Sequence, residues 1–219
     1  MIKGGIFDFD GTLFDSMYVW KDVAATYLIS RGCTPKPGLR EIVRRITLDQ
    51  SSRYCKEEYG LTESAEEIKD GFNNIVAGRY TNEVLPKANV IAFLESLQSL
   101  NVKMCIATAT DSHHIEAALS RCGMRQYFSD IITCSDVGCG KDKPDIFRAA
   151  LERLGTSRSD TIVFEDAYHA ICTAKADGFA VAGVYDDDEE NPSRIIEASD
   201  VYIHNYADLT NFWDYALHM

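Results

Sequence analysis

The sequence predicts an α/β fold: a Rossmann-like, doubly wound, mostly parallel sheet with an inserted helical cap domain. From residue 85 onward, short apolar runs alternate with amphipathic helical patterns, which is typical of parallel strands joined by crossover helices that cover both faces. Residues 16–80 contain only helical patterns, so they form an insertion after the first strand. We therefore assign residues 1–14 and 82–219 to the Rossmann-like core and residues 15–81 to the helical cap.

Each element of the core has its own sequence signal. The first strand ends at Ile6, and the later strands are expected at residues 102–107, 131–134, 161–164 and 180–184, with a short outer strand at 200–203. Glycine or proline punctuates the helical segments. We expect helices from Asp15 or Ser16 to about Arg31, within residues 39–80, and at 89–100, 113–122, 144–154 and 209–217, with a further helix between Asp166 and Gly178.

The bulk composition narrows the class of protein. The 34 acidic and 22 basic residues give a net charge of −12, which argues against a sequence-independent nucleic-acid binder. The seven cysteines are scattered and form no Cys-x-x-Cys pair, so we expect reduced core thiols and neither a disulfide framework nor a zinc site. No signal peptide or membrane-spanning run is recognisable. We expect a cytoplasmic protein with no nucleic-acid, membrane or obligate protein partner.

Two acids follow the first strand directly. Because side chains on a strand alternate between its faces, Asp8 and Asp10 can point the same way. Neighbouring carboxylates repel each other and stay ionised together when a cation lies between them. The carboxyl end of a strand is also where an open α/β sheet binds its ligand. The alternative is an ordinary strand-to-turn junction, since Asp and Gly are common in turns.

Polar residues end three further strands of the predicted sheet. Thr108 follows the second strand, Lys141 follows the third, and Glu165 and Asp166 end the fourth. In a doubly wound sheet these ends converge on the crevice that Asp8 and Asp10 also face.

The four sequence segments at these strand ends resemble the haloacid dehalogenase-like superfamily, in particular its capped phosphatases and phosphomutases. The matching segments are Asp-Phe-Asp-Gly-Thr-Leu-Phe-Asp-Ser at 8–16, Ile-Ala-Thr-Ala-Thr at 106–110, Gly-Lys-Asp-Lys-Pro-Asp-Ile-Phe at 140–147 and Phe-Glu-Asp-Ala at 164–167. They occur in the family's order, and the resemblance covers essentially the whole chain.

The resemblance implies a mechanism. Asp8 would attack the phosphoryl group and form an aspartyl-phosphate, and Asp10 would act as general acid and then as general base. Mg²⁺ would be held by Asp8, the backbone carbonyl of Asp10 and Asp166, with Glu165 bound directly or through water. Thr108 and the N–H of Ala109 would contact the phosphoryl oxygens, and Lys141 would supply a fixed positive charge.

Two choices within this assignment have alternatives. Lys143 competes with Lys141, which the alignment of the Pro-Asp-Ile-Phe segment favours. A dehalogenase expels halide, which needs no protonation, so an acid at Asp10 favours phosphoryl transfer.

The expected cap gives less specific signals. Arg44 and Arg45 could bind a second anionic group of the substrate or could be solvated helix residues. Sugar-phosphomutase relatives carry a cap histidine where this chain has Trp20, which favours hydrolysis over mutase activity. Elsewhere, we expect His113, His114 and the acidic run 186–190 to be solvated. His169 could reach the rim of the site, but we expect a surface position on its helix.

The sequence therefore predicts an Mg²⁺-dependent phosphatase acting on a small phosphorylated metabolite, such as a sugar phosphate. A β-phosphoglucomutase-like phosphomutase is the nearest alternative. A non-catalytic phosphate-binding or regulatory protein is the alternative from another class.

Overall fold

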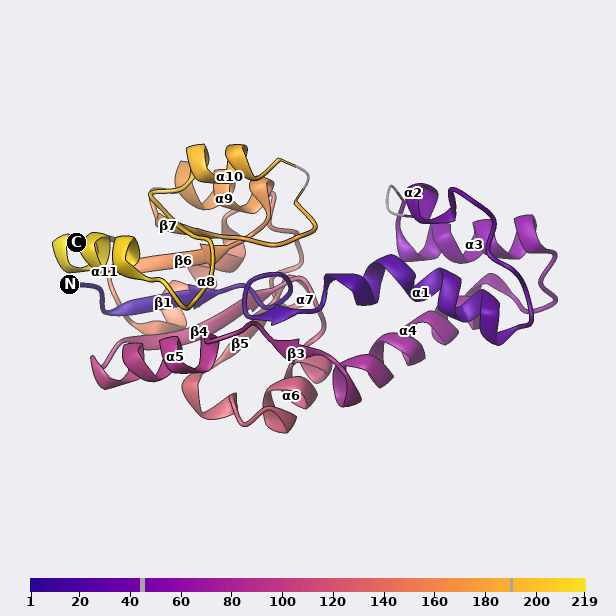
Figure 1. Ribbon diagram of the computed structural model, residues 1–219, viewed down its shortest axis with the longest axis horizontal. Coiled ribbons are helices and arrows are strands. Elements are labelled where there is room, and N and C mark those ends of the chain that lie inside the picture. Colours follow the sequence, from indigo (N-terminus) through magenta and orange to yellow (C-terminus); the bar gives the residue numbers. More distant parts are fainter. Residues whose placement is uncertain (44–45, 190) are drawn as a thin grey trace. The chain divides into compact units, whose positions relative to one another are not determined.

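The computed structural model describes residues 1–43, 46–189 and 191–219 (Figure 1). The chain forms two compact units. The core unit comprises Met1–Asp15 and Leu85–Met219, and the helical unit comprises Ser16–Val84. From the sequence, the insertion was predicted at residues 15–81.

The core unit contains a six-stranded sheet in the order β5-β4-β1-β6-β7-β8, and every pairing in it is parallel. This confirms the predicted doubly wound class. The strands are β1 (Gly4–Phe7), β4 (Lys103–Thr108), β5 (Ile131–Thr133), β6 (Thr161–Glu165), β7 (Ala180–Val184) and β8 (Val201–Ile203). The chain runs from β1 to one side of the sheet and then returns to the other side at β6, so β1 lies between the two halves. Ligands of open α/β sheets bind at such a reversal.

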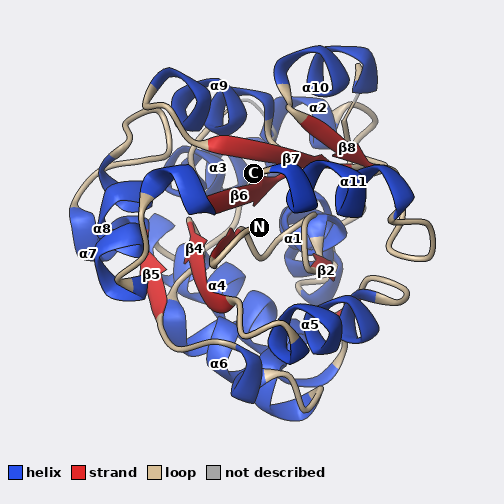
Figure 2. Ribbon diagram, turned by 90° about the vertical axis from the view of Figure 1, so that its left-hand side faces the viewer, coloured by secondary structure: helices blue, strands red, loops and turns tan. Residues whose placement is uncertain are grey.

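Helices lie on both sides of this sheet (Figure 2). They are α5 (Val90–Ser99), α6 (Ser112–Arg121), α7 (Cys134–Val137), α8 (Asp145–Leu154), α9 (Tyr168–Ala176), α10 (Pro192–Ala198) and α11 (Thr210–His218), with 3₁₀ turns at Arg125–Tyr127 and Arg158–Asp160. The third predicted strand is one residue shorter than expected. The Thr133 side chain accepts a hydrogen bond from the Asp136 N–H, which starts α7 at Cys134.

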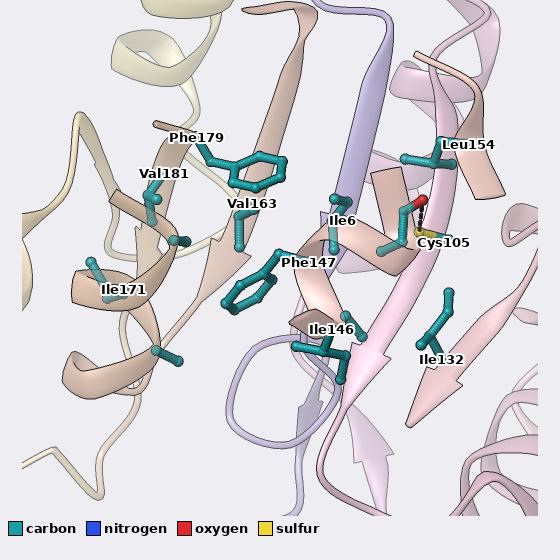
Figure 3. Packing of buried hydrophobic residues seen from close by; sticks show 14 of the residues in the cluster. Ile6, Cys105, Ile132, Ile146, Phe147, Leu154, Val163, Ile171, Phe179 and Val181 are labelled. Atoms are coloured by element: carbon teal, nitrogen blue, oxygen red, sulfur yellow. Dashed lines mark hydrogen bonds between the residues drawn. The ribbon is translucent and has the colours of Figure 1, made fainter. Parts of the chain in front are cut away.

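Successive residues of β1 pack on opposite faces of the sheet. Ile6 joins an apolar cluster with Val163 of β6 and Phe147 of α8 (Figure 3). Phe7 stacks on Phe164 of β6 on the other side, with ring centroids 4.1 Å apart, and meets the edge of Phe93 of α5. Because β1 is buried on both faces, its register is fixed, and Asp8 directly follows its last residue.

The helical unit contains α1 (Met17–Ser30), α2 (Leu39–Val43), α3 (Leu48–Tyr59) and α4 (Ala65–Asn82). Thr47 and Ser64 begin α3 and α4 with capping boxes. In each, the hydroxyl of the cap residue accepts a hydrogen bond from the N–H three residues later, and the side chain of that later residue accepts one from the N–H of the cap residue. Two aromatic contacts join α1 to α4. Tyr27 meets the ring of Phe72 edge-on, and Trp20 Nε1 donates to the Tyr80 hydroxyl over 3.1 Å.

The chain leaves and re-enters the core unit through two short strands that were not predicted from the sequence. β2 (Phe14–Asp15) and β3 (Leu85–Pro86) pair antiparallel. A strand of two residues has no periodicity for a pattern to reveal.

An ion-pair network next to these strands corrects one prediction. Lys87 Nζ lies 2.8 Å from Asp15 Oδ1 and 2.9 Å from Asp186 Oδ2. Asp186 is only 6% exposed, so the expectation that residues 186–190 form a solvated acidic loop is wrong for this residue. The ammonium group of Lys87, which is distant in sequence, compensates the buried charge. Asp187 is exposed, and Glu190 lies outside the described residues.

The sequence predicts reduced thiols, and all seven cysteines are free thiols in the structure. Only Cys55 and Cys105 are buried, so the expectation of core thiols holds for these two alone. Among the described residues, no helix has both the length and the apolar character needed to cross a bilayer.

Replacing Lys87 with Met should destabilise the core unit by about 3 kcal/mol, because it leaves the charge of the buried Asp186 carboxylate without an ion-pair partner. The free energy of unfolding in urea tests this. Lys3→Met is the matched control, since the Lys3–Asp160 pair is exposed and should contribute little. Adding Asp186→Asn to Lys87→Met should recover part of the loss. Equal stability of the two lysine variants would contradict a stabilising role for the Lys87 network.

Candidate active site

The turn after β1 places the first acids of the site. The Asp8 N–H continues the sheet by donating to the Phe164 carbonyl over 2.9 Å. The chain then turns sharply, and the N–H groups of Leu13 and Phe14 both donate to the Phe9 carbonyl. Gly11 adopts a positive φ of 79°, and a Cβ atom there would lie 2.5 Å from Asp166 Oδ2. Glycine is therefore required both by the backbone conformation and by the close approach to Asp166.

Asp8, Glu165 and Asp166 form a cluster of buried carboxylates at the carboxyl ends of β1 and β6. Each residue is at most 9% exposed, and one carboxylate oxygen from each lies within 4.8 Å of the others. The parallel pairing of Phe7 with Phe164 brings the two strand ends to the same height. The structure thus brings together three of the acids that were singled out in the sequence.

Lys141 lies in this cluster. It is 7% exposed, and its ammonium group forms ion pairs with Asp8 and with Glu165, the latter over 2.6 Å. Burial alone would lower the pKa of Lys141, but the charges of the two acids raise it above its usual value. Lys143, its rival in the sequence, is exposed.

Burial is the largest influence on the pKa values of Asp8 and Asp166. It raises the pKa of Asp8 to about 8, against the opposing effect of Lys141 and with a further increase from Glu165. Burial, followed by the charges of Glu165 and Asp8, raises the pKa of Asp166 well above its usual range. One lysine does not neutralise three carboxylates. When all three acids are ionised, this cluster of oxygen donors carries more negative charge than Lys141 compensates, which fits a hard divalent cation.

Hydrogen-bond donors orient the two acids at the carboxyl end of β6, Glu165 and Asp166. Thr12, fully buried, donates to Asp166 Oδ1 over 2.8 Å, while the Tyr206 hydroxyl donates to the Thr12 carbonyl over 3.0 Å. The Ala167 N–H donates to Glu165 Oε2 over 3.0 Å. Thr12 was assigned no role from the sequence, although it belongs to the Asp-x-Asp-Gly-Thr segment. Its contact with Asp166 spans 154 positions and has no local signal.

The carboxyl end of β4 contributes hydroxyl groups. Thr108 is buried, and its Oγ1 accepts a hydrogen bond from the Thr110 N–H over 3.1 Å. A hydroxyl that accepts one bond still has its hydrogen to donate. Ala109 is exposed. Thr110 Oγ1 donates to Asp10 Oδ2 over 2.6 Å, a contact that was not predicted from the sequence.

The histidine candidates do not join this cluster. Arg44 and Arg45 lie outside the described residues. His113 and His169 are exposed, as expected, but the prediction of a solvated His114 is wrong. His114 is 7% exposed because it lies on the buried side of α6 with Ile115, and burial together with the neighbouring His113 lowers its pKa.

Comparison with known proteins supports an enzymatic site. A phosphorylated carbohydrates phosphatase of Thermotoga maritima is 29% identical over 180 residues, which cover 79% of this chain and 80% of that protein. The fructose-1-phosphate phosphatase YqaB of Escherichia coli is 26% identical over 194 residues, covering 83% and 95%.

Solved structures show the same fold. A Thermotoga maritima protein provisionally described as a β-phosphoglucomutase superposes with a TM-score of 0.86 at 22% identity, covering 98% of this chain and 99% of that one. CbbY of Rhodobacter sphaeroides, crystallised with phosphate, gives a TM-score of 0.75 at 18% identity, covering 96% and 97%.

The family model described as haloacid dehalogenase-like hydrolase matches residues 5–184, a span that includes the acids of β1 and β6, the hydroxyls after β4 and Lys141. This chain belongs to the haloacid dehalogenase-like hydrolase family.

Proposed function

We propose that the protein is an Mg²⁺-dependent phosphatase that hydrolyses a small phosphorylated metabolite through an aspartyl-phosphate on Asp8. The observation that carries the proposal is the buried cluster of Asp8, Lys141, Glu165 and Asp166, with Asp10 two residues beyond Asp8. A passive phosphate-binding protein needs no such excess of carboxylates, because like charges repel the ligand.

The donor set suggests how the metal ion would be held. Asp8 and Asp166 would bind it through their side chains, and Asp10 through its backbone carbonyl. Glu165 accepts hydrogen bonds from Lys141 and from the Ala167 N–H, so it would position Lys141 and could also bind the ion directly or through water. The bound ion would supply positive charge to the phosphoryl oxygens.

The side chains divide the reaction into two steps. A carboxylate oxygen of Asp8 forms a bond to phosphorus while the ester P–O bond breaks, and Asp10 gives its proton to the leaving oxygen. In the second step the oxygen of a water molecule forms a bond to phosphorus while the Asp8 O–P bond breaks, Asp10 takes the proton of that water, and phosphate leaves with Asp8 regenerated as a carboxylate. Lys141, the Thr108 hydroxyl and the Ala109 N–H would bind the phosphoryl oxygens, and the ammonium of Lys141 also holds Asp8 in place.

We propose a phosphorylated sugar or a similar monoester as the substrate, because the relatives named above act on phosphorylated carbohydrates and fructose 1-phosphate. Trp20 favours hydrolysis over mutase activity, since its indole N–H can only donate a hydrogen bond and here donates to Tyr80. The role of residues 15–81 as a cap, the substrate contacts of Arg44 and Arg45, and the cytoplasmic location remain predictions.

Replacing Asp8 with Asn should lower kcat for phosphate release by at least about 10³-fold, because the amide is a poor nucleophile. The assay measures inorganic phosphate from a panel of sugar phosphates, with Mg²⁺ or with EDTA. Glu152→Gln, which changes an exposed acid on α8, is the control and should match the parent. An active Asp8→Asn variant, or full turnover in EDTA, would refute the mechanism.

A sugar 1-phosphate supplied with a catalytic amount of sugar bisphosphate distinguishes hydrolysis from mutase activity. We expect inorganic phosphate as the product. Accumulation of the 6-phosphate isomer would instead establish a phosphomutase.

The raised pKa of Asp8 predicts a pH-dependent affinity for Mg²⁺. Below pH 8 most of the metal-free protein carries a proton on Asp8, and Mg²⁺ must displace it, so affinity should increase from pH 6 to pH 8.5 with proton release on binding. Without metal, stability should fall as pH rises from about 4 to 8, because the folded state binds the proton that the unfolded state loses.

Calorimetric titration in buffers of different ionisation enthalpy measures both the affinity and the protons released. The Asp8→Asn variant should bind Mg²⁺ more weakly and release fewer protons. An affinity that does not change between pH 6 and 8.5 would contradict the competition between Mg²⁺ and a proton on Asp8.

A further inference from the structure

Thr110 makes a contact that the proposed mechanism does not yet use. Its side chain is buried, with 6% of the residue exposed, and Oγ1 donates to Asp10 Oδ2 over 2.6 Å. The two residues lie just beyond the carboxyl ends of adjacent strands, since β1 and β4 pair in parallel with Phe7 opposite Ile106. Asp10 follows Phe7 by three positions, and Thr110 follows Ile106 by four. The sheet itself therefore brings this hydroxyl to this carboxyl group.

The Thr110 hydroxyl is held in place from its own side. The Thr110 N–H donates to Thr108 Oγ1, which fixes the backbone immediately after β4. The β-branched side chain has few accessible χ1 rotamers, so its donor direction is well defined. In contrast, the terminal torsion of an aspartate side chain is broad and roughly two-fold. A rigid donor next to a partly exposed carboxyl group fixes the orientation of that group.

We infer that Thr110 is a positioning residue for Asp10: its hydroxyl holds the carboxyl group in the orientation that protonates the leaving oxygen. This inference rests on the proposed function. A general acid acts only within hydrogen-bond reach of the atom that it protonates, and small displacements of a reacting group cost large factors in rate. Thr110 thereby acts through Asp10 and does not need to touch the substrate.

The chemistry of the leaving group isolates this role. When the Asp8–phosphorus bond forms and the ester bond breaks, an alkoxide leaves with difficulty unless it receives the Asp10 proton. A nitrophenolate leaves readily without one. The ratio kcat/KM reports the reaction up to the first irreversible step, here the transfer of the phosphoryl group to Asp8. The later dephosphorylation, in which Asp10 acts as a base, does not enter this ratio.

The experiment compares the parent with Thr110→Val, Thr110→Ser and Asp10→Asn. The two substrates are p-nitrophenyl phosphate and the alkyl sugar phosphate that is hydrolysed fastest in the panel. Thr110→Val keeps the branched shape without the hydroxyl, and Thr110→Ser keeps the hydroxyl. We expect Thr110→Val to lower kcat/KM about 10- to 100-fold for the alkyl substrate and less than about 3-fold for the aryl substrate. Thr110→Ser should restore the parental ratio between the substrates.

The outcomes separate the inference from the proposed function. Suppose that Asp10→Asn loses more kcat/KM on the alkyl than on the aryl substrate. The positioning role of Thr110 is then overturned if Thr110→Val loses the same factor on both substrates or keeps the parental kcat/KM on both. If Asp10→Asn also loses the same factor on both substrates, Asp10 is not the general acid, and the inference fails together with that part of the proposed function. Melting temperatures close to the parental value would show that the variants are folded.

Discussion

The structure depends on the compensation of buried negative charge at the carboxyl ends of β1 and β6. Three carboxylates are removed from water there, and burial raises the pKa of Asp8 and that of Asp166. The ammonium of Lys141 pairs with Asp8 and Glu165. The Thr12 hydroxyl donates to Asp166, and the Ala167 N–H donates to Glu165. Buried charges are tolerated only when they are paired and hydrogen-bonded. In the proposed function, the remaining negative charge would attract a divalent cation, and the bound cation would in turn attract a phosphoryl group.

The same chain contains a buried carboxylate outside this cluster, in a different charge environment. Asp186 is buried like the acids of the site, but Lys87 pairs with it and also with Asp15, at the point where the chain leaves the core unit. Here one ammonium group faces two acids, one of them exposed, beside the short strands β2 and β3. In the cluster around Asp8 the acids outnumber the lysine three to one. The balance of charge, more than burial alone, distinguishes a structural ion pair from a candidate metal site.

Much of the fold was predictable from the sequence, because its signals are local. Alternation of apolar runs and amphipathic helices predicted the parallel sheet, and the absence of strand patterns in residues 16–80 predicted the helical insertion. Asp8, Glu165 and Asp166 could be grouped because parallel strands end at the same edge of a sheet.

The contacts that could not be predicted from the sequence join residues that are far apart in the chain. Thr12 with Asp166, Thr110 with Asp10, and Lys87 with Asp186 are separated by 99 to 154 positions, and each depends on three-dimensional packing. Asp186 precedes acidic residues of the same kind, and His114 follows another histidine. Residue type therefore could not show that Asp186 and His114 are buried while Asp187 and His113 are exposed. Two-residue strands such as β2 and β3 carry no periodic signal at all.

Direct detection of the phosphorylated residue tests the central claim, that the cluster allows an Asp8 oxygen to accept phosphorus. The enzyme would be mixed with substrate and Mg²⁺, quenched in acid during turnover and treated with borohydride, which reduces an acyl phosphate to an alcohol. Peptide mapping by mass spectrometry should then find homoserine at position 8. Turnover during which position 8 remains aspartate at every quench time, with the phosphoryl group on another residue, would contradict that claim.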